Sequence, residues 1–465
     1  MIKPFKFNLK CEFTPFEIFH KISVNEKYSF FLDSVDSGRN ADKSIIAYSP
    51  ETIIRSKLDR IEIIDNGKIT KITANPVKIL EGLFKKKSKI FNFSGGAIGY
   101  FSYDIKHFFE KLPSNAIDDM DLPDMYFVFC KNFLIFNYKT NSIEVLIFSE
   151  TEKKAEKELK NIYKKLAKKI YCNNNISNNK INIKSNLTMK QFEKMVVRAK
   201  EYIKEGDIFQ ANLSQRLGCD FEGNPYLLYE NLRKVNPSPF SCFLSFPELR
   251  IFGCSPERLL KIEDGKVVTR PIAGTYPRGN TKKKDEKLQK KLLSDEKEKA
   301  EHIMLVDLER NDLGRVCKYG TVKVNEMMIP EGYSHVTHIV SNITGVIKRN
   351  KNVFDVISSI FPGGTITGCP KIRCMEIIDE LEPTARGPYT GSCGWIDYKG
   401  NCDLNILIRT FILKNKKLYF QVGAGIVADS NPKREYFETL HKAKALIKAL
   451  KHTVTGNPST TLRTS

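Results

Sequence analysis

Short runs of aromatic and β-branched residues recur along this chain and alternate irregularly with stretches of helical periodicity. Residues 126–137, 240–246 and 250–254 are runs of the first kind, and their composition predicts β-strands. The clearest helical stretch follows Thr188 and Gln191, a spacing typical of a capping box at a helix start. Clusters of strands interrupted by helices in no fixed order predict an α+β protein with large antiparallel sheets.

The chain of 465 residues is long enough for one large domain or for two to three ordinary ones. An Asn-rich stretch at 172–179 has the composition of a linker. It divides a mostly stranded N-terminal region, 1–170, from a second region, 187–451. Residues 452–465 are rich in Ser and Thr and lack periodicity, which predicts a disordered tail.

Composition excludes several classes of protein. No run of 18 apolar residues and no signal-peptide core occur, so we expect a cytoplasmic protein without a membrane partner. The formal charge of +21 would suit a nucleic-acid-binding protein, but the lysines are spread through the sequence among many Asn and Ile. We therefore expect no nucleic-acid partner, and a basic surface that attracts anionic substrates. The 11 cysteines include no C-x-x-C pair, which argues for reduced thiols rather than a zinc site.

Two pairs of glutamates stand out by their spacing. A helix is predicted from Asp295 to Glu309 with Ser294 as its N-cap, and another starts at Pro432. Each carries two glutamates three residues apart, which therefore share a helix face: Glu298 and Glu301 on the first, Glu435 and Glu438 on the second, where Lys442 follows one turn later. Such pairs are usually solvated helix surface, although two converging pairs could hold a hard divalent cation. Spacing alone leaves both interpretations open.

Longer motifs identify a family. Residues 206–216, 255–258, 301–315, 361–371, 408–410 and 423–430 resemble, in order, blocks shared by the chorismate-utilising enzymes, and weaker matches lie at 31–34 and 95–100. Residues 270–275 resemble the signature turn of these enzymes. The resemblance is to component I of aminodeoxychorismate synthase and of anthranilate synthase. It implies two large antiparallel sheets packed together, helices outside them and an active-site cleft between them, so the N-terminal region is not expected to be independent.

The resemblance also implies roles for the substrate and metal residues. Glu301 and Glu438 would bind Mg²⁺ directly, while Glu298 and Glu435 would hold its water or outer shell. The ion would chelate the ring carboxylate of chorismate and polarise the C4 hydroxyl that must leave. The enolpyruvyl carboxylate would pair with a guanidinium. Further side chains would contact the substrate carboxylates, and a backbone segment of small residues would approach a substrate oxygen closely. The residues implied for these contacts are Arg409, Tyr389, Lys442, Gly423, Ala424 and Gly425.

The candidate catalytic residues come from the same blocks. Glu257 resembles the general acid that protonates the departing hydroxyl, and His338 resembles a histidine near that group. One histidine among seven would otherwise more often be structural. Thr275 closes the signature turn. Gln210 replaces the lysine base of relatives that add water, and because glutamine cannot deprotonate water, an amine nucleophile is indicated.

The residue at the centre of the signature turn bears on the product. Relatives that make 4-amino-4-deoxychorismate usually have a nucleophilic lysine there, and relatives that make anthranilate have alanine, as in Ala273. Four segments resemble the aminodeoxychorismate type instead: 212–215, 239–243, 362–368 and 31–34. They outweigh Ala273, so we expect amination of chorismate to 4-amino-4-deoxychorismate for 4-aminobenzoate and folate synthesis, with anthranilate synthesis as the alternative.

The nitrogen source is a further expectation. The chain has no recognisable Cys-His-Glu amidotransferase region. A separate glutamine amidotransferase subunit is therefore expected to supply ammonia, and an ammonium salt should replace it in vitro. With Ala273 in place of lysine, ammonia itself would attack C2, and a second ammonia would displace it from C4.

Overall fold

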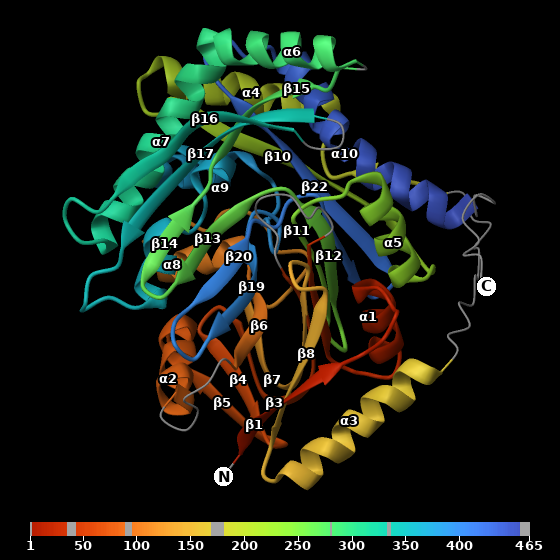
Figure 1. The fold of residues 1–465 in the computed structure, drawn as a ribbon. Coiled ribbons are helices and arrows are strands. Elements are labelled where there is room, and N and C mark those ends of the chain that lie inside the picture. Colours follow the sequence, from red (N-terminus) through yellow and green to blue (C-terminus); the bar gives the residue numbers. More distant parts are fainter. Residues whose placement is uncertain are drawn as a thin grey trace.

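The strands form one hydrogen-bonded network in which every pairing between strands is antiparallel. The computed structural model describes residues 2–34, 43–88, 95–168, 181–279, 281–332 and 336–455. The mixture of helices with antiparallel sheet confirms the predicted α+β class (Figure 1). The predicted linker at 172–179 lies outside the described residues.

Two long strands, β3 (Lys43–Lys57) and β7 (Met125–Asn137), join two sheets. Residues 43–48 of β3 pair with 132–137 of β7 in the first sheet, and residues 52–56 pair with 125–129 in the second. The register shifts between Pro50 and Thr52, next to Ser49, whose φ is 61°. A bulge bends a strand, which explains how one pair of strands contributes to both sheets.

The remaining strands extend each sheet from this pair. The first sheet runs, in spatial order, through β9 (Lys184–Ser185), β10 (Gln210–Asp220), β22 (Lys417–Ile426), β21 (Thr410–Lys414), β12 (Arg250–Ser255), β11 (Phe240–Ser245), β2 (Ser29–Asp33), β3, β7, β8 (Ser142–Ser149) and β1 (Lys3–Leu9). The second runs through β5 (Lys68–Thr73), β4 (Arg60–Asp65), β3, β7, β6 (Gly96–Phe101), β19 (Ser392–Asp397), β20 (Cys402–Asn405), β13 (Arg258–Glu263) and β14 (Lys266–Thr269), then β17 (Val336–Val346) with β15 (Ile272–Pro277) and β16 (Lys323–Gly332). The short β18 (Gly368–Cys369) pairs with β10.

Alternation of side chains along the strands separates the core into layers. In β7, Tyr126 and Val128 face a cluster that also contains Leu244 of β11 and Ile98 of β6, so this layer lies between the two sheets. The alternate residue Phe127 faces the opposite side of the second sheet. Packing of the two sheets through a shared apolar layer is the arrangement that the family resemblance implied.

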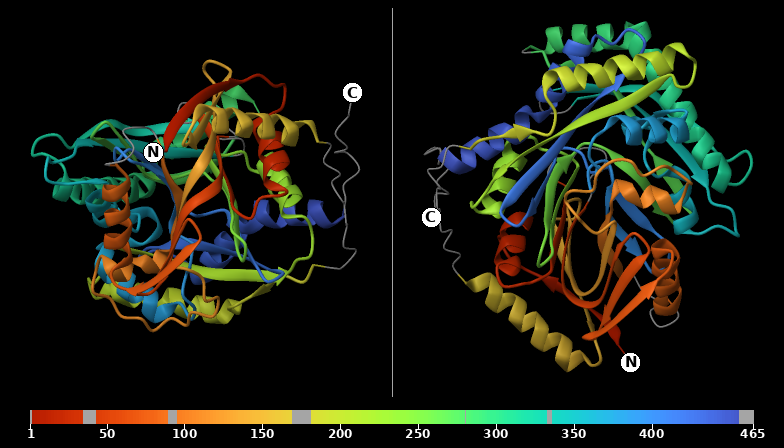
Figure 2. Two further views of the ribbon diagram at one scale, coloured as in Figure 1. Left: turned by 90° about the horizontal axis from the view of Figure 1, so that it is seen from below. Right: turned by 180° about the vertical axis from the view of Figure 1, so that it is seen from behind.

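Helices cover the outer faces of both sheets, as Figures 1 and 2 show. The outer face of the first sheet packs against α1 (Pro15–Ser23), α3 (Glu152–Ala167), α5 (Pro225–Val235) and α10 (Pro432–Thr455). The outer face of the second packs against α2 (Pro76–Ser88), α7 (Glu296–Val316) and α8 (Val353–Ile360). The other helices are α4 (Met189–Lys204), α6 (Lys282–Ser294), α9 (Lys371–Leu381) and the 3₁₀ turns η1 (Tyr103–Phe108) and η2 (Gly364–Ile366).

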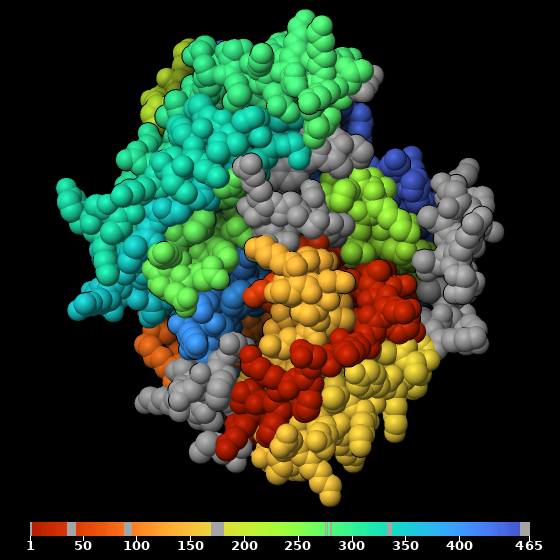
Figure 3. All heavy atoms as spheres, in the orientation of Figure 1, coloured from red at the N-terminus to blue at the C-terminus, as the bar shows by residue number. Residues whose placement is uncertain are grey.

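N-terminal strands are built into the same sheets as later strands. β2 pairs with β11 and β6 pairs with β19, so segments more than 200 residues apart share hydrogen bonds. On the face in Figure 3, the N-terminal segments in red to yellow occupy most of the lower half, in contact with green and blue segments. Residues 1–170 thus contribute strands to both sheets.

The structure tests the predicted helix ends. The capping box of Thr188 and Gln191 is confirmed at the start of α4. Ser294 was wrong as an N-cap: it ends α6, and Asp295 caps α7 by accepting hydrogen bonds from the N–H groups of Lys297 and Glu298. Within the described chain, no helix is both long enough and apolar enough to cross a membrane.

The predicted tail also needs correction. Residues 452–455 belong to α10 rather than to a disordered segment, and 456–465 lie outside the described residues. The helix continues because Thr453 is buried, where its hydroxyl accepts a hydrogen bond of 2.9 Å from Asn231 of α5.

Candidate active site

A cleft of about 790 Å³ opens between the far ends of the two sheets. Its walls come from β10 and β22 of the first sheet, β15 and β17 of the second, the helices α7 and α10, and the loop at 235–238. Ten of the residues singled out from the sequence line it: Gln210, Ala273, Glu298, Glu301, His338, Arg409, Gly425, Glu435, Glu438 and Lys442.

The other five candidates adjoin the cleft or face away from it. Glu257 follows the lining residue Pro256, and Thr275 lies opposite His338 in the β15–β17 pairing. A Cβ on Gly423 would lie 2.8 Å from the Tyr389 hydroxyl, so these two residues are neighbours. The side chain of Ala424, in contrast, packs in the core with Phe192 of α4.

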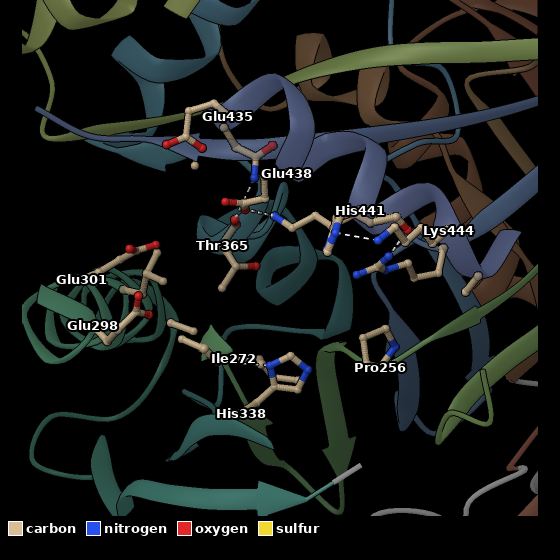
Figure 4. A pocket seen from close by; sticks show the side chains of 18 of the residues that line it. Pro256, Ile272, Glu298, Glu301, His338, Thr365, Glu435, Glu438, His441 and Lys444 are labelled. Atoms are coloured by element: carbon tan, nitrogen blue, oxygen red, sulfur yellow. Dashed lines mark hydrogen bonds and ion pairs between the residues drawn. The ribbon is translucent and has the colours of Figure 1, made fainter. Parts of the chain in front are cut away.

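The four glutamates face one another across the cleft (Figure 4). Burial raises the pKa of Glu298, and the neighbouring charges of Glu301, Asp295 and Glu438 raise it further. Burial likewise raises the pKa of Glu435, with Glu438 adding to the effect. The pairs on α7 and α10 thus lie on walls of the same cleft, near enough for their charges to affect one another.

Their oxygens suit a hard divalent cation in kind, because carboxylates are its preferred ligands and a cation would relieve their mutual repulsion. In their present arrangement, Glu301 accepts a hydrogen bond of 2.7 Å from Gln210, and Glu438 lies 2.9 Å from the ammonium group of Lys442. Among the described residues, no group of three or more His, Cys, Asp or Glu side chains is close enough together to enclose a metal.

Glu257 is a buried acid with a strongly altered pKa. It is 5% exposed, and burial raises its pKa to about 7, against smaller opposite effects from Thr365, the Ile272 backbone and Lys442. Its backbone is held on both sides: its N–H donates to Ser255 Oγ at 3.3 Å, and its carbonyl accepts from the Ile406 N–H at 3.0 Å. A carboxyl group with this pKa can donate a proton near neutral pH.

His338 is held as a neutral ring. Burial lowers its pKa to about 4, and the positive charges of Arg409 and Lys442 act in the same direction. Its Nδ1 lies 3.2 Å from the carbonyl oxygen of Gly274, which assigns the proton to Nδ1. Gly274 has a φ of +66° at a register shift in β15, and this bulge brings the Gly274 carbonyl to His338 while Ala273 lines the cleft.

Arg409 lies in a strained backbone conformation at the end of the loop before β21. Its φ is +53°, which is uncommon for a non-glycine residue and is often retained at functional sites. Its guanidinium donates to the carbonyl of Lys442 on α10, and burial lowers its pKa. Lys442 in turn donates to the carbonyl of Gly423 at 3.0 Å. These contacts join α10 to β21 and β22 around two cations of the cleft.

Sequence reasoning missed several lining residues. Lys297, Lys444 and Lys448 add positive charge near the opening, and His441 lies beside Lys444. Helical spacing from Glu438 could have indicated the residues of α10. Asn212 and Thr365 were quoted within motifs, but nothing in the sequence showed that their side chains line the cleft.

The four segments that favoured 4-amino-4-deoxychorismate as the product lie at two separate cavities. Asn212 of the first and Thr365 of the third line the cleft. The segments 31–34 and 239–243 meet elsewhere, at a separate cavity of about 250 Å³ where β2 and β11 pair. Asp33 is buried there and lies 2.6 Å from Arg233.

Together, the two packed sheets and a cleft that combines carboxylates, a buried acid and a basic opening define an enzyme for an anionic substrate. Residues 62–448 match the family described as chorismate binding enzyme. The chain therefore belongs to the chorismate binding enzyme family.

Relatives of two activities resemble the chain over nearly its whole length. It is 43% identical to anthranilate synthase component 1 of Acetivibrio thermocellus, across 94% of this chain and 92% of that protein. It is 40% identical to aminodeoxychorismate synthase component 1 of Bacillus subtilis, across 93% of each. The structure of anthranilate synthase component I from Streptococcus pneumoniae is 35% identical, with a TM-score of 0.78 across 89% of this chain and 94% of that one.

Proposed function

We propose that this protein aminates chorismate with ammonia to give 4-amino-4-deoxychorismate. The observation that carries the amination is the convergence, in one cleft, of four glutamates and the cations of Arg409 and Lys442, with a glutamine rather than a lysine in its wall and the buried acid Glu257 beside it. Ammonia adds to the ring, and the C4 hydroxyl leaves as water.

Each wall of the cleft has a part in this reaction. Arg409 and Lys442 bind the carboxylates of the substrate, where a guanidinium fork gives directional hydrogen bonds. Glu257, protonated near neutral pH, gives its proton to the departing hydroxyl oxygen. His338 stays neutral at that pH and lines the same cleft.

Glu298, Glu301, Glu435 and Glu438 would hold Mg²⁺. When bound, the ion supplies positive charge that neutralises the ring carboxylate and polarises the leaving hydroxyl. The remaining lysines near the opening would raise the local concentration of a dianionic substrate.

The partner follows from the nitrogen source. We expect a glutamine amidotransferase subunit to release ammonia for this cleft, since the relatives are named as the first component of their synthases. An ammonium salt at high concentration should replace that subunit.

The test is mass spectrometry of the products formed from chorismate, Mg²⁺ and an ammonium salt by the purified chain. The expected product retains the enolpyruvyl group and is converted to 4-aminobenzoate by an added lyase. Release of pyruvate together with anthranilate would contradict the proposed product, while absence of any ammonia-dependent consumption of chorismate would contradict amination itself.

Anthranilate synthesis is the second candidate, and two observations favour it. Ala273 lines the cleft where a lysine nucleophile would lie in the usual aminodeoxychorismate enzyme. Anthranilate synthase is also the name of the relative with 43% identity. Against these stands the polar side chain of Asn212 in the cleft wall, at a position where anthranilate enzymes usually have valine.

A further inference from the structure

The signature turn and the first turn of α7 meet at the edge of the cleft. Tyr276 directly follows the signature turn on β15. The first turn of α7 starts after its N-cap, Asp295, and carries Glu298. A Cβ on Gly274 would lie 2.9 Å from Glu298 Oε2, so the Glu298 carboxylate lies close to the signature turn. The place of α7 relative to β15 therefore determines where this carboxylate lies.

One aspartate links the two segments. Asp295 Oδ1 accepts hydrogen bonds from the backbone N–H groups of Lys297 at 3.1 Å and Glu298 at 3.3 Å. Its second oxygen, Oδ2, accepts a hydrogen bond of 3.1 Å from the Tyr276 hydroxyl. The two oxygens have different partners, so the side chain that caps α7 also ties the helix to β15.

Both groups are in the ionisation states that this contact needs. The backbone hydrogen bond from Glu298 lowers the pKa of Asp295, burial opposes this effect, and the Tyr276 hydroxyl lowers the pKa further. Burial raises the pKa of Tyr276, and the contact with Asp295 and the charge of Glu298 add to the effect. Asp295 is therefore a carboxylate at neutral pH and the tyrosine keeps its proton, which makes the contact a charge-assisted hydrogen bond.

The first turn of α7 depends on such support. The first N–H groups of a helix have no partner within the helix, so a helix start is held largely by its cap. Glu298 also lies near enough to Glu301, Asp295 and Glu438 for their charges to disfavour its ionised form. Carboxylates that are to bind a cation must be held in place against this repulsion, because ordering them at the time of binding lowers the affinity.

We propose that Tyr276 is a positioning residue for the cation site of the cleft. Through Asp295 it holds the first turn of α7 against β15, and so keeps Glu298 close to the signature turn before a cation binds. The inference rests on the proposed cation site and assigns how one of its glutamates is positioned. Because the Tyr276 hydroxyl bonds to Asp295 rather than to substrate or cation, its loss should change the affinity for the cation and leave the rate of the fully loaded enzyme nearly unchanged.

The test is the binding of Mn²⁺ to the full chain without substrate, followed by the electron paramagnetic resonance signal of the free ion. Mn²⁺ is a suitable probe because it takes the same oxygen ligands as Mg²⁺. Tyr276→Phe keeps the ring, which lies 5.9 Å from the Lys291 ammonium group, and removes only the hydroxyl. We expect the Kd for Mn²⁺ to rise about three- to tenfold, as the loss of one hydrogen bond implies. At saturating Mg²⁺, kcat and KM for chorismate should stay near the wild-type values.

Tyr319→Phe is the matched control. Tyr319 lies beyond the other end of α7 and is fully exposed, so the same chemical change there should leave the Kd for Mn²⁺ as in the wild type.

A double-mutant cycle tests whether Tyr276 acts through Asp295. Asp295→Ser keeps an N-cap oxygen but is too short to reach the tyrosine. If the hydrogen bond carries the effect, adding Tyr276→Phe to the Ser variant should not raise the Kd for Mn²⁺ again, whereas independent effects would add. Asp295→Thr, which also caps a helix, serves if the Ser variant does not fold.

The outcomes separate this inference from the proposed function. A lower melting temperature of Tyr276→Phe with an unaltered Kd for Mn²⁺ would mean that the tyrosine is only structural, and additive effects in the cycle would mean that it does not act through Asp295. Either result overturns the inference and leaves the cation site standing. Wild-type protein that binds no Mn²⁺ would overturn the cation site and the inference together. Formation of anthranilate would contradict the proposed product alone, since cation binding is measured without substrate.

Discussion

Replacing Glu257 by Gln should remove most of the activity and, at alkaline pH, make the folded protein more stable. Burial raises the pKa of this carboxyl from 4.5 to about 7 in the folded protein. Because the charged form is disfavoured in the fold, Glu257 contributes fully to stability below about pH 4.5. That contribution is lost as the pH rises to about 7, and the loss is constant above it. At 1.36 kcal/mol per pKa unit, the loss is about 3 kcal/mol.

The measurement is a double difference in the free energy of unfolding, from urea denaturation of both proteins at about pH 5.5 and about pH 8.5. Because the pKa of Glu257 is raised in the folded protein, the free energy of unfolding of the wild type should fall by about 2 kcal/mol between these two pH values, relative to the Gln variant. Every other titrating group is common to both proteins, so the difference isolates Glu257. Equal pH dependence of the two proteins would refute the claim that burial alters this pKa.

Activity supplies the second half of this test. With free ammonia held constant, kcat/KM for chorismate should fall above about pH 7 as Glu257 ionises. The Gln variant should be slower by about 10²- to 10⁴-fold and should lack that decline. A variant that retains near wild-type rates would show that another group protonates the departing hydroxyl.

Four further outcomes are expected. Ala273→Lys should still form an aminated product from chorismate, because Ala273 lines the open cleft, and product analysis that finds none would count against direct attack by ammonia. Arg409→Lys should raise KM for chorismate by about 10- to 100-fold through loss of the guanidinium fork, with an unchanged KM being the contrary result. Removal of divalent cations with a chelator should abolish activity, and Mg²⁺ should restore it. Activity that survives chelation would mean that the four glutamates do not hold a required cation. Arg386→Met should destabilise the protein by about 3–5 kcal/mol in urea denaturation, since Arg386 is 1% exposed and its loss leaves Glu382 buried without its partner at 2.7 Å; a smaller loss would mean that Glu382 is neutralised in another way.

Much of the local structure could be predicted from neighbouring residues. The capping box at Thr188, the helix after Pro432 and the strands near 126–137 and 250–254 follow from interactions within a few positions of one another. The misplaced N-cap at Ser294 shows the limit of such reasoning. Two helices abut there, and Ser294 and Asp295 are both good capping residues, so the choice depends on where the preceding helix ends.

The sequence by itself determined the α+β class, the family and the helix faces that carry the glutamate pairs, because these depend on local periodicity and on contiguous motifs. Only the tertiary structure brought α7 and α10 to opposite sides of one cleft, and only burial in that cleft raised the pKa of Glu257 and lowered that of His338. The hydrogen bonds from Gln210 to Glu301 and from Asn212 to the Thr365 carbonyl are likewise a tertiary property, since the partners lie about 90 and 150 residues away in the chain. Desolvation and hydrogen-bond pairing depend on what the fold places around a group, and a linear sequence does not contain that information.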